Sequence, residues 1–312
     1  MDQNEVIRLV ETLNLRTIEL RDSDIYSAGI RANNIHKLTH PLTFDHLRSG
    51  FRAWLTSRRF ARAPRHEPRS NLDPTTWEKS LRPGSRAKKV VVYSCITGGY
   101  DVPLEPLMDV PQLDYVMFLS GSEVPHSTKW DIRPIPSEIQ RLANNSLINR
   151  YIKFHPHELF GDSYDASIYI DGNIQVISDL SYYADMIHPQ AGIALHYHRT
   201  RNSIADEMIA CNALGKGSLP KMQAQVNNYK AQGFPLDYGL LECNIIAVDL
   251  HSTLSKKLIA EWWDEHCRFD SGRDQLALPY VLWKNNIPIE YVATMGHNAY
   301  RDSKVFIKNH DA

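Results

Sequence analysis

A carboxylate and an amide stand two residues apart where a predicted strand ends. Residues 168–170 (Ile-Tyr-Ile) are β-branched or aromatic, as a buried strand requires, and the run stops at Asp171, Gly172 and Asn173. Ligands of open α/β sheets bind at the carboxyl ends of strands. A carboxylate and an amide at that place can hold a divalent cation or a sugar hydroxyl. Taken alone, the same residues also suit an ordinary Asx turn.

A glycine-rich turn follows an earlier predicted strand at residues 88–95. The residues of this turn are Thr97, Gly98, Gly99, Tyr100 and Asp101. A first strand that ends in such a turn usually opens a nucleotide-binding α/β domain, although neither a dinucleotide fingerprint nor a P-loop motif is present. Tyr100 could stack on a base and Asp101 could accept its N–H, but a plain turn would use the same residue types.

Further polar residues come from helices and strands later in the chain. Arg150 and Lys153 lie one helical turn apart and would suit a diphosphate, or form an ordinary solvated pair. Glu242 lies on a predicted core strand, where it makes structural hydrogen bonds or faces a ligand. Asp274 and Gln275 begin a predicted helix, a place that capping alone also favours.

Alternating strands and helices from residue 88 onward predict an α/β domain with a mainly parallel sheet. Strands are predicted at 88–95, 114–120, 130–135, 168–170, 192–198, 241–248 and 287–292. Helices are predicted at 2–21, 43–62, 137–149, 180–186, 203–213, 220–232, 252–267 and 271–283. We therefore divide the chain into a helical extension with a Pro-rich connector, 1–86, and the α/β domain, 87–312.

Composition excludes several classes of protein. The 312 residues are 43% hydrophobic and 23% charged with a net charge of -1, so a folded chain without a global basic field for nucleic acid is expected. The four scattered cysteines indicate free thiols in a reducing compartment. Since no leader-like segment or long apolar run is present, we expect a cytoplasmic protein.

The predicted helix at 43–62 is amphipathic and strongly basic. Phe51 and Trp54 belong to its apolar stripe, and five arginines fill the other faces. Such a helix could contact the anionic inner face of a membrane, or pack on the α/β domain or on a second copy of it.

These motifs, in this order, resemble those of the GT-A-fold glycosyltransferases, whose central strand ends in a DxD motif. The pair Asp274-Gln275 followed by His297 is similar to the layout of the glycogenin and lipopolysaccharide galactosyltransferase group. More closely, residues 88–300 resemble a bacterial and plant mucilage-related family, once catalogued as a domain of unknown function and now placed among glycosyltransferases. Further matches to it are His198-x-x-Arg201 with Glu207, residues 239–244, 262–265 and 273–276.

The resemblance implies a role for each matching residue. Thr97, Gly98, Gly99, Tyr100 and Asp101 would hold the donor's base, and Arg150 and Lys153 its departing diphosphate. Mn²⁺ or Mg²⁺ would be held by Asp171, Asn173 and His297. Asp171, Asp274, Gln275 and Glu242 would serve catalysis, with Asp274 or Glu242 as the base. His198, Arg201, Asn244 and Arg273 would meet the acceptor or the sugar.

The implied function is transfer of a hexose-like sugar from a nucleotide diphosphate to a glycan or lipid-linked acceptor in polysaccharide biosynthesis. The glycogenin-like layout favours retention of configuration. Asn173 stands where the best-known metal-dependent transferases carry Asp, which weakens a hard cation site. A non-catalytic module that binds nucleotide sugar or glycan is therefore the alternative function, with a hydrolase as a third. Homo-oligomers are compatible with all three.

Overall fold

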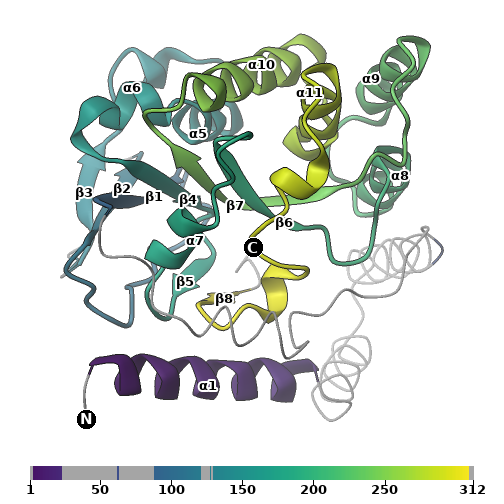
Figure 1. Ribbon diagram of the computed structural model, residues 1–312. Coiled ribbons are helices and arrows are strands. Elements are labelled where there is room, and N and C mark those ends of the chain that lie inside the picture. The colour runs from purple at the N-terminus through teal and green to yellow at the C-terminus, as the bar shows by residue number, and fades with distance from the viewer. Residues whose placement is uncertain (1–2, 23–61, 63–87, 121–126, 128, 309–312) are drawn as a thin grey trace, which may run out of the picture.

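A six-stranded sheet organises the part of the chain that the computed structural model describes, residues 3–22, 62, 88–120, 127 and 129–308 (Figure 1). Its strand order is β3-β2-β1-β4-β7-β6. The strands are β1 (Val90–Ile96), β2 (Leu113–Leu119), β3 (Asp131–Pro134), β4 (Ala166–Ile170), β6 (Ile193–Tyr197) and β7 (Leu241–Asp249). A second sheet pairs β5 (Ile174–Val176) with β8 (Val305–Ile307).

Strand direction brings the polar strand ends to one edge. Strands β1, β2, β3 and β4 are parallel, whereas β7 runs antiparallel to both β4 and β6. The predicted α/β fold with a mainly parallel sheet is therefore confirmed. Because β7 is reversed, its first residues lie at the edge of the sheet where β1 and β4 end, which puts Glu242 at the same edge as Asp171.

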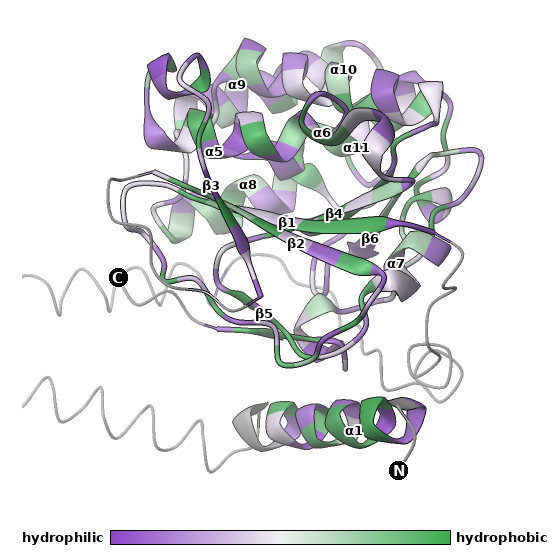
Figure 2. Ribbon diagram, turned by 90° about the vertical axis from the view of Figure 1, so that its left-hand side faces the viewer, coloured by the Kyte–Doolittle hydropathy of each residue, from purple (hydrophilic) through white to green (hydrophobic). Residues whose placement is uncertain are grey.

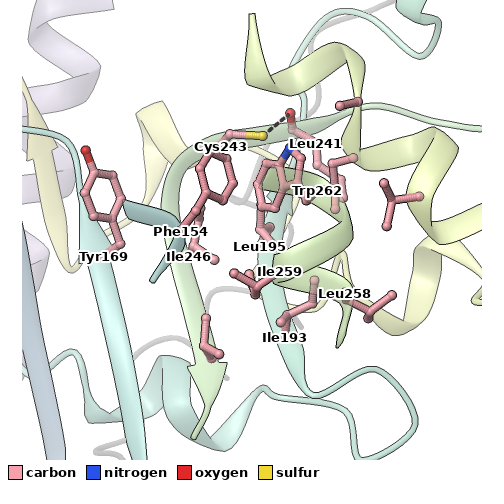
Figure 3. Packing of buried hydrophobic residues seen from close by; sticks show 14 of the residues in the cluster. Phe154, Tyr169, Ile193, Leu195, Leu241, Cys243, Ile246, Leu258, Ile259 and Trp262 are labelled. Atoms are coloured by element: carbon pink, nitrogen blue, oxygen red, sulfur yellow. Dashed lines mark hydrogen bonds between the residues drawn. The ribbon is translucent and has the colours of Figure 1, made fainter. Parts of the chain in front are cut away.

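Helices cover one face of this sheet. Alternate strand residues, including Tyr93, Tyr169 and Ile246, point into this helical layer. There Phe154 and Trp262 lie side by side (Figure 3) and pack edge to face. Their ring centroids are 4.6 Å apart. The helices of this layer are α5 (Asn145–Phe154), α6 (Pro156–Phe160), α8 (Ile204–Ala213), α9 (Leu219–Ala231), α10 (Thr253–Phe269) and α11 (Leu278–Lys284).

The other face is covered by α7 (Ser181–Asp185) and the small sheet β5–β8. Helix α1 (Gln3–Asp22) lies beneath that small sheet and contacts β8 (Figure 1). Its Asn14 donates a hydrogen bond to Ser303 O, 289 residues further along the chain. Ile7, Leu15 and Ile18 of α1 are buried, while Leu9 and Leu13 are exposed. Figure 2 shows the resulting alternation of hydrophobic and hydrophilic residues around α1 and the hydrophobic central strands. The first helix therefore belongs to the packed domain.

Two predicted helices are each divided in the structure. The helix expected at 137–149 is a 3₁₀ turn at Ile139–Arg141 followed by α5, because the side chain of Asn144 accepts a hydrogen bond from Leu147 N and starts a new helix. The helix expected at 271–283 is likewise split into a 3₁₀ turn, Asp274–Leu276, and α11.

The strand predicted at 287–292 is wrong. Pro288 is followed by a 3₁₀ turn at Ile289–Tyr291, since a proline without an N–H does not suit an inner strand. The last strand is instead β8, a short apolar segment that the sequence pattern did not single out. The basic helix predicted at 43–62 lies outside the described residues except for Arg62, and so does most of the extension 1–86. Among the helices described, none is long and apolar enough to cross a membrane.

Two glycines test how closely β6 approaches helix α10. Gly192 has φ +69°, and a Cβ there would lie 2.8 Å from Ser252 Oγ and 2.9 Å from Ser255 Cβ, whereas Gly233 has φ +87° and would meet no described atom within 4 Å. Gly233→Ala should lose about 1–2 kcal/mol of unfolding free energy from left-handed strain alone. Gly192→Ala should lose about 1–3 kcal/mol more because of the steric contact. Urea unfolding of both variants measures the difference, and equal losses would contradict this packing.

Candidate active site

A cleft of about 580 Å³ opens where β1 and β4 end and β7 begins. That volume lies in the range of pockets for small molecules and cofactors. Most of the predicted site residues line it: Thr97, Gly98, Tyr100, Asp101, Arg150, Lys153, Asp171, Asn173, Glu242, Asn244, Arg273, Asp274 and Gln275. Four predicted residues, Gly99, His198, Arg201 and His297, do not line this cleft.

The glycine-rich turn after β1 forms one end of the cleft. Gly98 and Gly99 have φ +65° and +66°, a left-handed conformation that favours glycine. The Gly98 N–H donates to Ser120 Oγ at 2.8 Å, and the Thr97 hydroxyl donates to Asn145 O at 3.0 Å. These bonds fix the turn, and 58% of Tyr100 stays exposed at the cleft, so its ring face is accessible to a flat ligand.

The turn after β4, which begins at Asp171, lines the same cleft as the glycine-rich turn. The Asp171 N–H donates to Asn244 O at 2.9 Å, which continues the pairing of β4 with β7, and Ile174 N closes the turn on Asp171 O. A Cβ on Gly172 would lie 2.8 Å from Ile96 Cγ1 and 3.3 Å from Asp101 Oδ2. Glycine is therefore needed for the close approach, which brings the Asp101 carboxylate next to the Asp171 turn.

Asp274 is the electrostatic centre of the opposite wall. Its carboxylate is 2.6 Å from Lys153 Nζ and 3.3 Å from Arg150 Nε, and its backbone carbonyl accepts a bond from Trp262 Nε1 at 2.9 Å. Burial alone would raise the pKa of Asp274, but Arg150, Lys153 and Arg273 together hold it well below its usual value. Asp274 is thus ionised, and Arg150 and Lys153 do share one helix face, as their spacing predicted.

The two cations differ in what they leave free. The Lys153 side chain is almost fully buried against Asp274, whereas 21% of the Arg150 side chain is exposed. Guanidinium carries five donors in a fixed fork, so one carboxylate contact does not exhaust it. Arg150, which also donates to Asn149 Oδ1, therefore keeps donors that can meet an anion in the cleft, whereas Lys153 does not.

A second ionic network lies behind Glu242. The Glu207 carboxylate accepts hydrogen bonds from two arginines, from Arg201 Nε at 2.5 Å and from Arg273 Nη2 at 3.3 Å. His198 Nε2 is 3.6 Å from both Glu207 and Glu242. Burial lowers the pKa of His198 against the opposing effect of the two carboxylates, so the imidazole is neutral at neutral pH. His198 and Arg201 therefore support Glu242 and Arg273 from outside the cleft.

Of the predicted metal ligands, Asp171 and Asn173 line the cleft and His297 does not. His297 is exposed and stacks on Tyr197 with ring centroids 5.3 Å apart. No three His, Cys, Asp or Glu side chains form a metal-type group within the described part of the chain. Asp171 and Asn173 offer a small oxygen set at the cleft, which fits a cation carried in by phosphate ligands rather than one caged by protein.

Sequence reasoning missed Tyr300, which lines the cleft from the C-terminal segment and carries the Arg199 guanidinium 4.2 Å from its ring centroid. No motif spacing signals Tyr300, because its position depends on where the chain returns after β7.

The cleft also contains two thiols. Burial raises the pKa of Cys95 to about 12 and that of Cys243 well above its usual value, so neither is a thiolate nucleophile.

These features define an α/β domain whose cleft, at the carboxyl ends of parallel strands, combines carboxylates, an accessible guanidinium and an exposed aromatic ring. The family model described as "TOD1/MUCI70, glycosyltransferase-like domain" matches residues 140–310, more than half of the chain. The chain belongs to this family of glycosyltransferase-like domains, in agreement with the resemblance seen in its motifs.

Two solved structures of glycosyltransferases are distantly similar. The crystal structure of mouse xyloside xylosyltransferase 1 in its apo form has a TM-score of 0.40 and 8% identity, over 70% of this chain and 97% of that one. The apo structure of the WbbM bifunctional glycosyltransferase has a TM-score of 0.36 and 12% identity, over 69% of this chain and 39% of that one. Likeness this weak identifies neither a substrate nor a reaction. No curated protein sequence matches significantly.

Substitution of Asp274 tests the electrostatic centre. Asp274→Asn leaves Lys153 buried without its counter-charge and should lower the unfolding free energy by about 3–5 kcal/mol at pH 7. Because the folded pKa lies below the unfolded value near 3.9, this loss should be complete above pH 5 and shrink as the pH falls below about 4. Denaturant titrations across pH measure both effects.

The control is Asp270→Asn, which removes the carboxylate of an exposed pair with Lys221. It should change the unfolding free energy by less than about 1 kcal/mol. Equal effects of the two substitutions would contradict the central role of Asp274.

Proposed function

We propose that the protein transfers a sugar from a nucleotide-diphosphate donor to a hydroxyl group of a glycan or lipid-linked glycan. The observation that carries this proposal is the cluster of Asp274, Arg150 and Lys153, which lines the same cleft of small-molecule size as Asp171. A partly accessible guanidinium held by a buried carboxylate suits a diphosphate that gains charge as it leaves.

The donor would lie with its base at the glycine-rich turn. Tyr100 has the exposed ring to stack on a base, and Asp101 a carboxylate that can accept the N–H of that base or bind a ribose hydroxyl. Its diphosphate would then reach Arg150, and its sugar would lie near Gln275 and Glu242.

Glu242 is the better candidate for the base that takes the proton of the acceptor hydroxyl. Asp274 is ion-paired with two cations and has a depressed pKa, so its carboxylate is a weak base. Glu242 lines the cleft, where the Gln275 amide lies 3.4 Å from its carboxylate and the neutral His198 lies 3.6 Å from it, and its charge also raises the pKa of Tyr300. A base acting in this way accompanies inversion of configuration, in contrast to the retention that the glycogenin-like layout suggests.

Mn²⁺ or Mg²⁺ is proposed as a cation bound between Asp171 and the donor's phosphates. When bound, it would neutralise charge on the diphosphate. Asp171 supplies the carboxylate, and the chain's own Arg150 shares the neutralisation from the other wall.

The three buried free cysteines, Cys95, Cys211 and Cys243, agree with a reducing compartment, so we propose a cytoplasmic location. Contact of residues 44–62 with the inner membrane face stays a prediction, since that segment lies outside the described residues apart from Arg62.

A non-catalytic nucleotide-sugar-binding module is the second candidate, favoured by the single carboxylate of the Asp171-Gly172-Asn173 motif. Incubation of the full chain with a panel of nucleotide sugars, with and without Mn²⁺, separates the two. The transferase should hydrolyse one donor slowly without acceptor, and Glu242→Gln should lower transfer to an acceptor at least about a hundredfold while donor binding persists. Binding without turnover of any donor, with or without glycan acceptors, would favour the module.

The metal proposal predicts loss of activity in excess EDTA and recovery with Mn²⁺. Asp171→Asn should raise the Mn²⁺ concentration for half-maximal activity about tenfold or more, because it removes the charged oxygen ligand. His297→Ala should shift that concentration by less than about twofold, since the ring stacks on Tyr197 outside the cleft lining. Full activity in EDTA would contradict the proposal.

A further inference from the structure

The third residue of the motif, Asn173, is bonded in both directions to the C-terminal segment of the chain. Its side-chain Nδ2 donates to Lys308 O at 2.7 Å, and its backbone carbonyl accepts from Lys308 N at 2.9 Å. The pairing continues through β5 and β8, where Ile174 faces Ile307 and Val176 faces Val305. The turn that presents Asp171 is thus joined to residues 305–308.

The bond from Asn173 Nδ2 gives a reason for an amide at this position. A carboxylate has no proton to donate at neutral pH, so Asp would set a negative charge against the Lys308 carbonyl. An amide can make this bond, and it does so at a distance typical of a strong hydrogen bond. Asn173 therefore has a contact that the Asp of a DxD motif could not replace.

Helix α1 holds the same segment from its other side. Lys304 Nζ is 2.6 Å from Glu11 Oε1, and both side chains are fully buried. Asn14 Nδ2 donates to Ser303 O at 2.9 Å and to Val305 O at 3.0 Å. Removing either charge would leave the other buried without a partner, so these contacts fix α1 and the C-terminal segment to each other.

This segment also reaches the cleft and the main sheet. Tyr300 and Ile307 line the cleft, and the Asp302 carboxylate accepts a hydrogen bond from His196 of β6 at 2.8 Å. Burial alone would raise the pKa of Asp302, but His196 and Lys304 lower it. The carboxylate is therefore ionised where it meets His196. The segment is thus attached to the motif turn, to β6 and to α1, with two side chains at the cleft.

We infer that Asn173 is a positioning residue that fastens the C-terminal segment 300–308 to the Asp171 turn, and that α1 supports this segment from behind through Glu11 and Asn14. The first and last elements of the described chain are thereby joined, and the last one contributes Tyr300 and Ile307 to the lining of the donor cleft. The inference rests on the proposed function for the identity of the ligand, though not for the contacts. It assigns to the first helix a part in binding the donor.

The isosteric substitution Asn173→Asp distinguishes positioning from metal ligation, because the two roles predict opposite results. If Asn173 is a weak metal ligand, a carboxylate should lower the Mn²⁺ needed for half-maximal activity and leave the donor KM unchanged or improved. If Asn173 positions the segment, the donor KM should rise about tenfold, the value of one hydrogen bond of ordinary strength, without a lower Mn²⁺ requirement. A donor KM equal to or below that of the wild type would overturn the inference.

The matched control is Gln140→Glu. Gln140 Nε2 donates to Ile135 O at 2.6 Å, the same type of amide-to-carbonyl bond, but Gln140 neither lines the cleft nor contacts the C-terminal segment. Gln140→Glu should leave the donor KM within about twofold of the wild-type value. A rise equal to that of Asn173→Asp would mean that any such lost bond impairs the enzyme, and would overturn the specific role of Asn173.

Amide hydrogen exchange tests the wall without any turnover, so it separates failure of this inference from failure of the proposed function. In the full chain, Asn173→Asp and Lys304→Met should each speed exchange at residues 305–308 at least about tenfold, while β1 keeps its protection. The donor, or a nucleoside diphosphate alone, should slow exchange there in the wild type. Unchanged exchange at 305–308 in Asn173→Asp would overturn the inference, whereas lack of turnover in the wild type would count only against the transferase.

Discussion

The buried ion pairs of Asp274 are the interaction on which the site depends. The carboxylate joins α5, through Lys153 and Arg150, to the loop before α11, and Trp262 of α10 holds the Asp274 backbone. Charges in such a place are stable only while each has its partner. The cluster therefore fixes three elements relative to the sheet edge and leaves part of the Arg150 guanidinium accessible to the cleft.

The strands supply the other half of the geometry. Since β7 runs against its neighbours, Glu242 and Asn244 reach the edge where Asp171 and the glycine-rich turn already stand. A wholly parallel sheet would place the start of β7 at the opposite edge. The cleft thus brings together residues from distant parts of the sequence, and the C-terminal segment, fixed by Asn173 and α1, adds Tyr300.

Local patterns in the sequence predict the sheet strands β1, β2, β4, β6 and β7, because each is a short, largely apolar run whose length and β-branched or aromatic residues favour a strand. Strand β3 is predicted too, although none of its four residues is buried. The resemblance to the glycosyltransferase family, rather than any local pattern, implies that Asp171, Arg150 and Asp274 belong to one site. The local patterns do not predict that Lys153 forms a buried ion pair with Asp274, or that His198 and Arg201 lie behind the cleft. The choice of partner depends on tertiary packing. The short strand β8 and the partner of Asn173 escape notice for the same reason, as both depend on contacts more than a hundred residues away.

Equilibrium binding of a nucleoside diphosphate, compared with the monophosphate and the nucleoside, tests the central claim most directly. By calorimetry, the diphosphate should bind at least about tenfold more tightly than the monophosphate, and Arg150→Met should remove most of that difference while the nucleoside's affinity is kept. Equal affinity for all three ligands, or a diphosphate preference unaffected by Arg150→Met, would contradict the account of this cleft as a nucleotide-sugar site.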